Sequence, residues 1–68
     1  MDFELNGQEY ITMDNLLKVL GLVETGGEAH IRIVDGEVTF NGSTEYQKRK
    51  KIRQGDVVTY NGHTIKVK

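Results

Sequence analysis

The chain has no cysteine, no proline and no tryptophan among its 68 residues. Without cysteine it can form neither a disulfide scaffold nor a thiolate metal site. It also lacks a long apolar run and a secretory leader, so we expect no membrane insertion, no export and a cytoplasmic location. A hydrophobic content of 37% is enough for one small domain with a modest core.

Groups that could support catalysis are scarce as well. Ser43 is the only serine, and the two histidines, His30 and His63, lie in different predicted elements. A nucleophile needs a neighbouring base, and a metal ion needs ligands at short spacing. We therefore expect no enzyme activity, no small-molecule substrate, no metal and no cofactor, which leaves binding functions.

Three Asn-Gly pairs, at residues 6–7, 41–42 and 61–62, each lie between short stretches rich in β-branched or aromatic residues. Asn and Gly both accept the positive φ of a type I′ turn, so the pair is a strong hairpin signal. The pattern predicts three hairpins, which join residues 3–5 to 9–11, 38–40 to 44–46, and 57–60 to 64–67.

Between the first two pairs the hydrophobic period changes from 2 to 3.6. Apolar residues at positions 13, 16, 17 and 20 predict a helix that begins after Thr12 as N-cap and ends at Gly21. A second helix is predicted from Thr25, with Glu28 as its capping-box partner, to Gly36. Its apolar face is expected to contain Ala29, Ile31, Ile33 and Val34.

The predicted fold class is therefore α+β. Two short packed helices in a helix-turn-helix arrangement are followed by β-hairpins in a small, mainly antiparallel sheet. We expect residues 1–68 to form a single domain.

Charge is divided unevenly along the chain. Residues 1–46 contain nine acids and only two cations, a formal −7, whereas residues 47–68 contain seven cations and Asp56, a formal +6. Within residues 48–53, here called the basic segment, four consecutive cations repel one another, and no nearby acid in the sequence relieves this. Such a run of cations is usually a solvated surface. The position of this run in an otherwise acidic domain, however, favours an anion site for nucleic-acid phosphates. Its cations are Lys48, Arg49, Lys50, Lys51 and Arg53.

The second predicted helix is poorly suited to bind in the DNA major groove. It carries Glu28 and Asp35 against the single cation Arg32, so its surface would repel phosphates. Arg32 is spaced to pair with either acid, so a local ion pair competes with a nucleic-acid contact. Gly26 and Gly27 leave room for a phosphate at the helix start, but capping by Glu28 competes for the same N–H groups.

Two further side chains have both a structural and a binding interpretation. His30 borders the apolar face of the second helix, where packing of its ring is the alternative to a nucleic-acid contact. Tyr46 adjoins the basic segment and can supply a stacking surface for a base.

The segment from Leu16 to Gly55 resembles the RNA-binding domain first known from small-subunit ribosomal protein S-four, also called the alpha-L motif. The chain looks most like the small stand-alone bacterial members of the YaaA and YbcJ type, whose whole length is about one such domain. The matching positions are Leu16-Leu17, Gly21-Leu22, Thr25-Gly26-Gly27-Glu28-Ala29, Gly36-Glu37-Val38, Asn41-Gly42, Glu45, Lys51-Ile52 and Gly55-Asp56, together with the basic run.

This resemblance implies binding of structured RNA, ribosomal or transfer RNA, with a core motif at about residues 12–56. The binding surface would comprise the paired helices and the following hairpin, with Lys48, Lys50 and Lys51 at basic positions of the family pattern. The family often has Lys or Arg where this chain has His30 and Gln47. No catalytic domain accompanies the motif, so the resemblance implies no modifying activity.

The principal hypothesis is a non-catalytic, monomeric RNA-binding module, with ribosome association also expected. The alternative is a protein-interaction module whose basic pole docks on an acidic partner. Lys66 and Lys68 would extend the surface only if the last strand lies beside the basic segment. The candidate RNA-binding residues are Lys48, Arg49, Lys50, Lys51 and Arg53 for most of the affinity, and Lys18, His30, Arg32 and Asn41 as rim or backbone contacts.

Overall fold

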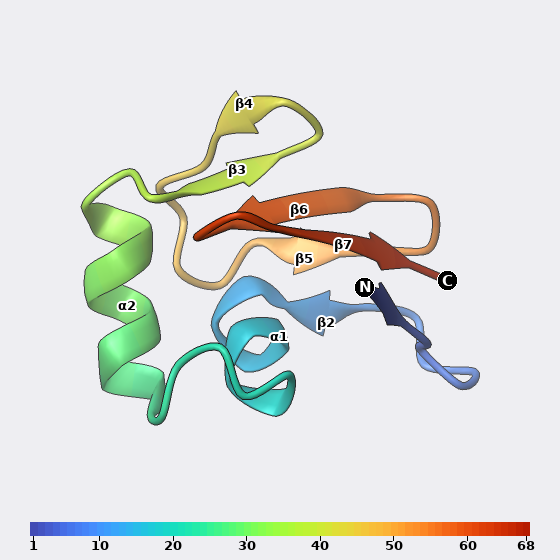
Figure 1. The fold of residues 1–68 in the computed structure, drawn as a ribbon. Coiled ribbons are helices and arrows are strands. Elements are labelled where there is room, and N and C mark those ends of the chain that lie inside the picture. The colour runs from blue at the N-terminus through green and yellow to red at the C-terminus, as the bar shows by residue number, and fades with distance from the viewer.

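A five-stranded sheet and a separate two-stranded ribbon pack against two short helices in the computed structural model, which describes residues 1–68 (Figure 1). Neither helix is long and apolar enough to cross a membrane. The predicted α+β class is confirmed. The elements in chain order are β1 (Asp2–Phe3), β2 (Ile11–Thr12), α1 (Met13–Val19), α2 (Gly26–Val34), β3 (Val38–Phe40), β4 (Ser43–Thr44), β5 (Lys51–Ile52), β6 (Val57–Tyr60) and β7 (His63–Val67).

The five-stranded sheet has the order β1-β7-β6-β3-β4, and β2 pairs with β5 in the ribbon. Every neighbouring pair is antiparallel except β1 and β7, which run parallel. Two of the predicted hairpins are confirmed, β3–β4 around Asn41 and β6–β7 around Asn61, and both asparagines have a φ of 49°. Turn chemistry therefore correctly identified the hairpins in the second half of the chain.

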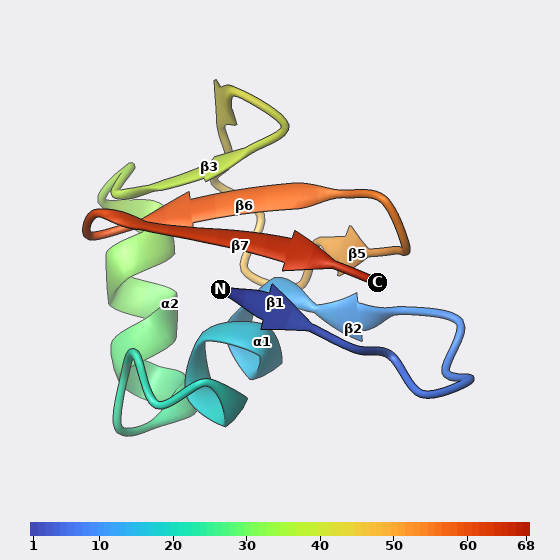
Figure 2. The same ribbon diagram turned by 45° about the vertical axis from the view of Figure 1, so that its right-hand side comes forward.

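The predicted hairpin at Asn6-Gly7 is wrong. The turn itself forms, because Asn6 and Gly7 have φ values of 53° and 88° and the Gln8 N–H donates to the Leu5 carbonyl at 3.1 Å. The two strands that flank this turn, however, pair with strands from the second half of the sequence. β1 lies beside β7 and β2 beside β5, as Figure 2 shows. Long-range pairing thus overrides the local signal.

Both helices begin and end at the predicted positions, although the Thr12 side chain makes no capping hydrogen bond at the start of α1. The Thr25 hydroxyl accepts a hydrogen bond from the Glu28 N–H at 3.1 Å, and Glu28 Oε1 accepts one from the Glu24 N–H at 2.8 Å. At the end of α2 the N–H groups of Gly36 and Glu37 donate to the carbonyls of Ile33 and Arg32, a Schellman motif. α1 ends in the same way at Gly21.

The core lies where the two helices pack on the sheet and the ribbon. Ala29 and Ile33 are fully buried, as predicted, but Ile31 and Val34 are 61% and 53% exposed. Ile31 lies two residues from Ala29 and from Ile33, a rotation of about 200° on a helix, so it points away from the core. The buried hydrophobic residues are Leu5, Met13, Leu16, Leu17, Val23, Ala29, Ile33, Val38, Ile52, Val58, Tyr60, Ile65 and Val67.

Candidate nucleic-acid interface

The basic segment forms the end of the β4–β5 connection and strand β5, and its backbone is attached to the start of α1. The Met13 N–H donates to the Lys50 carbonyl at 2.9 Å, and the Asp14 N–H donates to the Lys48 carbonyl at 3.1 Å. The Asn15 N–H donates to the Asp14 carboxylate at 2.9 Å. The first N–H groups of a helix have no partner inside the helix, so these contacts supply what α1 lacks.

The side chains of the basic segment do not form one continuous patch. The Lys50 Nζ lies 5.0 Å from the centroid of the Phe40 ring, toward β3. The Lys51 Nζ and the Arg53 Cζ lie 5.0 and 5.6 Å from the centroid of the Tyr10 ring, on the ribbon. These distances are within the range of cation–π attraction. The segment therefore presents its charge over two neighbouring regions.

Ion pairing divides the cations into two groups. Arg49 and Arg53 have acidic partners, Asp14 at 3.8 Å and Glu9 at 3.2 Å. Lys48, Lys50 and Lys51 belong to no ion pair. An unpaired surface cation keeps its full charge available for a phosphate, so these three lysines are the strongest candidates for phosphate contacts.

Asp14 joins three parts of the surface. Its side chain is only 6% exposed, and its Oδ2 lies 2.9 Å from His30 Nε2 of α2 and 3.8 Å from Arg49 Nε of the basic segment. Burial acts to raise the pKa of Asp14, but the neighbouring Thr12 hydroxyl, His30 and the Asn15 N–H lower it more, so the net pKa lies below its ordinary value. A buried carboxylate thus holds His30 and Arg49 at the same place.

Arg32 and Lys18 lie farther from this centre. Arg32 pairs with Glu28 at 3.6 Å and with Glu37 at 3.4 Å, and mainly the Glu37 hydrogen bond raises its pKa. The local ion pair left open by the sequence is therefore formed, with Glu37 rather than Asp35 as the second partner. Lys18 is exposed and unpaired, one helical turn after Asp14 on the same face of α1.

The Asn41 side chain is engaged within the fold. Its Nδ2 donates to Asp56 at 3.1 Å, and its Oδ1 accepts from the Val57 N–H at 2.8 Å. These bonds tie the β3–β4 turn to the start of β6. Besides its predicted place in the turn, Asn41 thus stabilises the fold through side-chain bonds that the local sequence does not predict.

The last strand does not lie beside the basic segment. β7 has β1 and β6 as neighbours, whereas β5 pairs with β2. Lys68 pairs with Asp2 at 2.9 Å, and Lys66 stands opposite Asp2 in the strand register. These two lysines therefore belong to another part of the surface.

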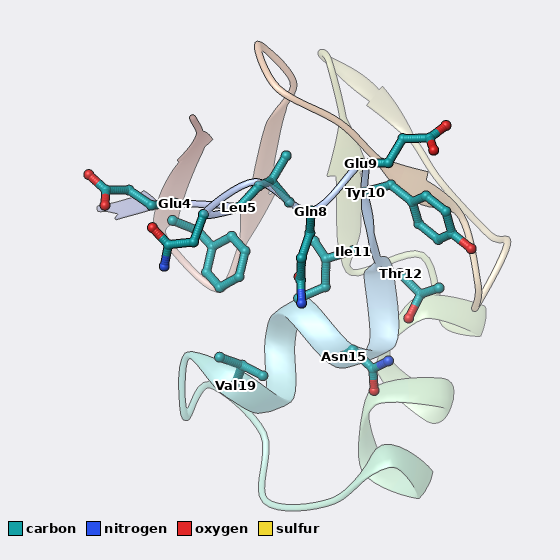
Figure 3. Close-up of a pocket in the computed structure, with 11 residues that line it drawn as sticks. Glu4, Leu5, Gln8, Glu9, Tyr10, Ile11, Thr12, Asn15 and Val19 are labelled. Carbon is teal, nitrogen blue, oxygen red and sulfur yellow. The ribbon is translucent and has the colours of Figure 1, made fainter.

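Tyr10 was missed as a candidate site residue. It lies at the end of an open groove away from Glu4, as Figure 3 shows. Lys51 and Arg53 lie over its ring. Tyr46, which the sequence favoured, has no cation over its ring and lies against Gly36 at the end of α2. Alternation of Tyr10 and Thr12 with the apolar Ile11 is the only local signal for Tyr10, since its cationic neighbours lie about forty residues away.

Comparison with known proteins identifies the family. A family model described as S4 domain matches residues 3–68. YbcJ of Escherichia coli (strain K12) and YbcJ of Shigella flexneri are each 37% identical to this chain over 65 residues, or 96% of this chain and 93% of the relative. The solution structure of YbcJ from E. coli, described as revealing an alphaL motif involved in RNA binding, matches with a TM-score of 0.74 and 36% identity over 97% of this chain and 84% of that chain. The predicted resemblance is confirmed, and the chain belongs to the S4 domain family.

Proposed function

We propose that this chain is a non-catalytic, monomeric, cytoplasmic protein that binds structured RNA, of ribosomal or transfer type, through the basic segment. The observation that carries the proposal is the set of three unpaired lysines, Lys48, Lys50 and Lys51, on the basic segment, whose backbone is attached to α1. Membership of the S4 domain family and the RNA-binding description of the YbcJ structure support it.

The three lysines would contact phosphates, with Arg49 and His30 beside them at Asp14. Lys18, Arg32 and Arg53 would contribute at the rim, whereas the Asn41 side chain is occupied by its bonds to Asp56 and Val57. Phosphate contacts fix position and orientation but carry little sequence information, so recognition would rest on RNA shape. With about three to five phosphates neutralised, the slope of log affinity against log salt should be roughly −2 to −5.

The test is a fluorescence-anisotropy titration against a labelled, folded ribosomal RNA fragment, with unlabelled duplex DNA of matched length as competitor. Binding that survives the DNA supports recognition of RNA shape. Charge reversal of Lys48, Lys50 and Lys51 together should abolish binding without unfolding the protein, because none of the three side chains takes part in an ion pair.

A matched control separates a local contact from a general charge effect. Lys48→Gln and Lys66→Gln change the net charge equally, but Lys66 lies on β7 away from the basic segment. Lys48→Gln should weaken binding several-fold and Lys66→Gln should leave it nearly unchanged. Equal effects of the two variants, or binding erased by duplex DNA, would reject this RNA-binding site and favour an acidic protein as the partner of the basic pole.

A further inference from the structure

The exposed face of the β2–β5 ribbon carries an aromatic ring among cations. The register pairs Ile11 with Ile52 and Thr12 with Lys51, so its continuation places Tyr10 opposite Arg53. Residues directly opposite each other in an antiparallel pair project from the same face. The fully buried Ile52 marks the inner face, so Tyr10, Lys51 and Arg53 share the outer one.

On that face, the two cations lie over the tyrosine ring. The Lys51 Nζ and the Arg53 Cζ lie 5.0 and 5.6 Å from the centroid of the Tyr10 ring, and Tyr10 is 38% exposed. Arg53 is also paired with Glu9 at 3.2 Å, whereas Lys51 has no acidic partner. The site therefore offers a partly exposed aromatic ring, one cation without an acidic partner and one cation held by Glu9.

This combination matches what an unpaired nucleotide requires. A base stacks on an aromatic side chain, and its phosphate is neutralised by a cation a short distance away. The bases of a continuous duplex are stacked on one another and cannot offer a face to Tyr10. Only a bulge, a loop or a strand end can do so.

We propose that Tyr10, with Lys51 and Arg53, forms a stacking site for an unpaired base, so that the preferred RNA carries an unstacked nucleotide beside the helical part held by Lys48 and Lys50. The inference rests on the proposed function and specifies its substrate class. Lys51 would bind the phosphate of the extruded nucleotide, and Arg53, fixed by Glu9, would border the stacked base.

The test compares two RNA hairpins that differ only in a single bulged nucleotide, which is the fluorescent base 2-aminopurine. The protein should bind the bulged hairpin about tenfold more tightly than the continuous one, since each stacked base contributes roughly 1–3 kcal/mol. Stacking on Tyr10 should also quench the 2-aminopurine fluorescence. Tyr10→Phe should keep both effects, because the ring remains.

Tyr10→Leu should lose the preference for the bulged hairpin and the quenching of 2-aminopurine. It should still bind the continuous hairpin with the affinity of the wild type. That unchanged binding shows that the variant is folded and that its basic segment is intact. Tyr46→Leu is the matched control, because Tyr46 is 62% exposed but has no cation over its ring. It should behave as the wild type.

Three results would overturn the inference. The wild type could bind both hairpins equally, the preference could survive in Tyr10→Leu, or Tyr10→Leu could weaken both hairpins to the same extent. Failure of the proposed function gives a different result, since the wild type would then bind neither hairpin.

Discussion

Asp14 connects α1, α2 and the basic segment, and replacing it with asparagine tests how much that connection stabilises the fold. The substitution keeps the shape of the side chain and removes the charge that faces His30 at 2.9 Å and Arg49 at 3.8 Å. Asparagine can still accept the hydrogen bond from the Asn15 N–H. What is lost is the interaction of a carboxylate with its neighbours.

The size of the effect follows from the exposure of those neighbours. Removing one partner of a fully buried ion pair costs about 3–5 kcal/mol, because the other charge remains buried. Here the side chains of His30 and Arg49 are 39% and 79% exposed, so water can solvate both after the change. A hydrogen bond to a charged group contributes roughly 1.5–3 kcal/mol, and we expect Asp14→Asn to lower the free energy of unfolding by about 2 kcal/mol at pH 7.

Such a loss would be large for this chain. A domain of this size has a total stability of roughly 3–10 kcal/mol. The melting temperature should fall by about 8–16 °C, and urea unfolding followed by circular dichroism should give the free energy. Asp35→Asn, the same chemical change at an exposed acid with no ion pair, is the control and should stay within about 0.5 kcal/mol.

The difference should also depend on pH in one direction. The folded state lowers the pKa of Asp14 below its ordinary value of 3.8. The stabilisation is therefore complete above that value and is lost as pH falls through the folded-state pKa. Wild type and Asp14→Asn should converge in acid. A gap below 0.5 kcal/mol at pH 7, using the usual range for neutral surface changes as the threshold, or a gap that widens in acid, would refute this account.

Two further substitutions test the turns that border the surface. Asn41→Ala removes the hydrogen bonds to Asp56 and Val57 and places alanine at a φ of 49°, so urea unfolding should show a loss of about 2 kcal/mol with unchanged RNA affinity of the folded protein. A fall in affinity with unaltered stability would instead make Asn41 an RNA contact. Gly36→Ala places a Cβ at a φ of 80° and 3.4 Å from the Tyr46 ring, and the melting temperature should fall by an amount equivalent to about 1–2 kcal/mol. Tyr46→Leu in the same background should recover only the part due to contact with the ring, and full recovery would show that the positive φ costs nothing.

Features that depend on neighbours in sequence were predictable. The Thr25 cap, the Gly21 and Gly36 stops and the two later hairpins each need only a few adjacent residues, and the structure has all of them. Ile31 and Val34 were predicted to lie on the buried face of the second helix, and this was wrong. A helical wheel places Ile31 on the side opposite Ala29 and Ile33. The rotation per residue of a helix is therefore enough to predict that Ile31 points away from the core.

Features that depend on distant pairing were not predictable in the same way. Nothing near Asn6 indicates that β1 will lie parallel to β7, and nothing near Tyr10 indicates that β5 will bring Lys51 and Arg53 to its ring. The sequence identified the cations of the candidate site, because charge is visible in composition. It could not show that they are divided between two regions, since this depends on which strand lies beside β5.

The attachment of the basic segment to α1 by its carbonyls has a consequence for binding. Because the two bonds use main-chain atoms of Lys48 and Lys50, they hold the loop at two points without using its side chains. A loop ordered in advance loses little conformational entropy when a ligand arrives, so more of each contact appears as affinity. The same rigidity prevents the loop from adapting to its ligand, so selection among RNA molecules falls to those whose phosphates already match its spacing.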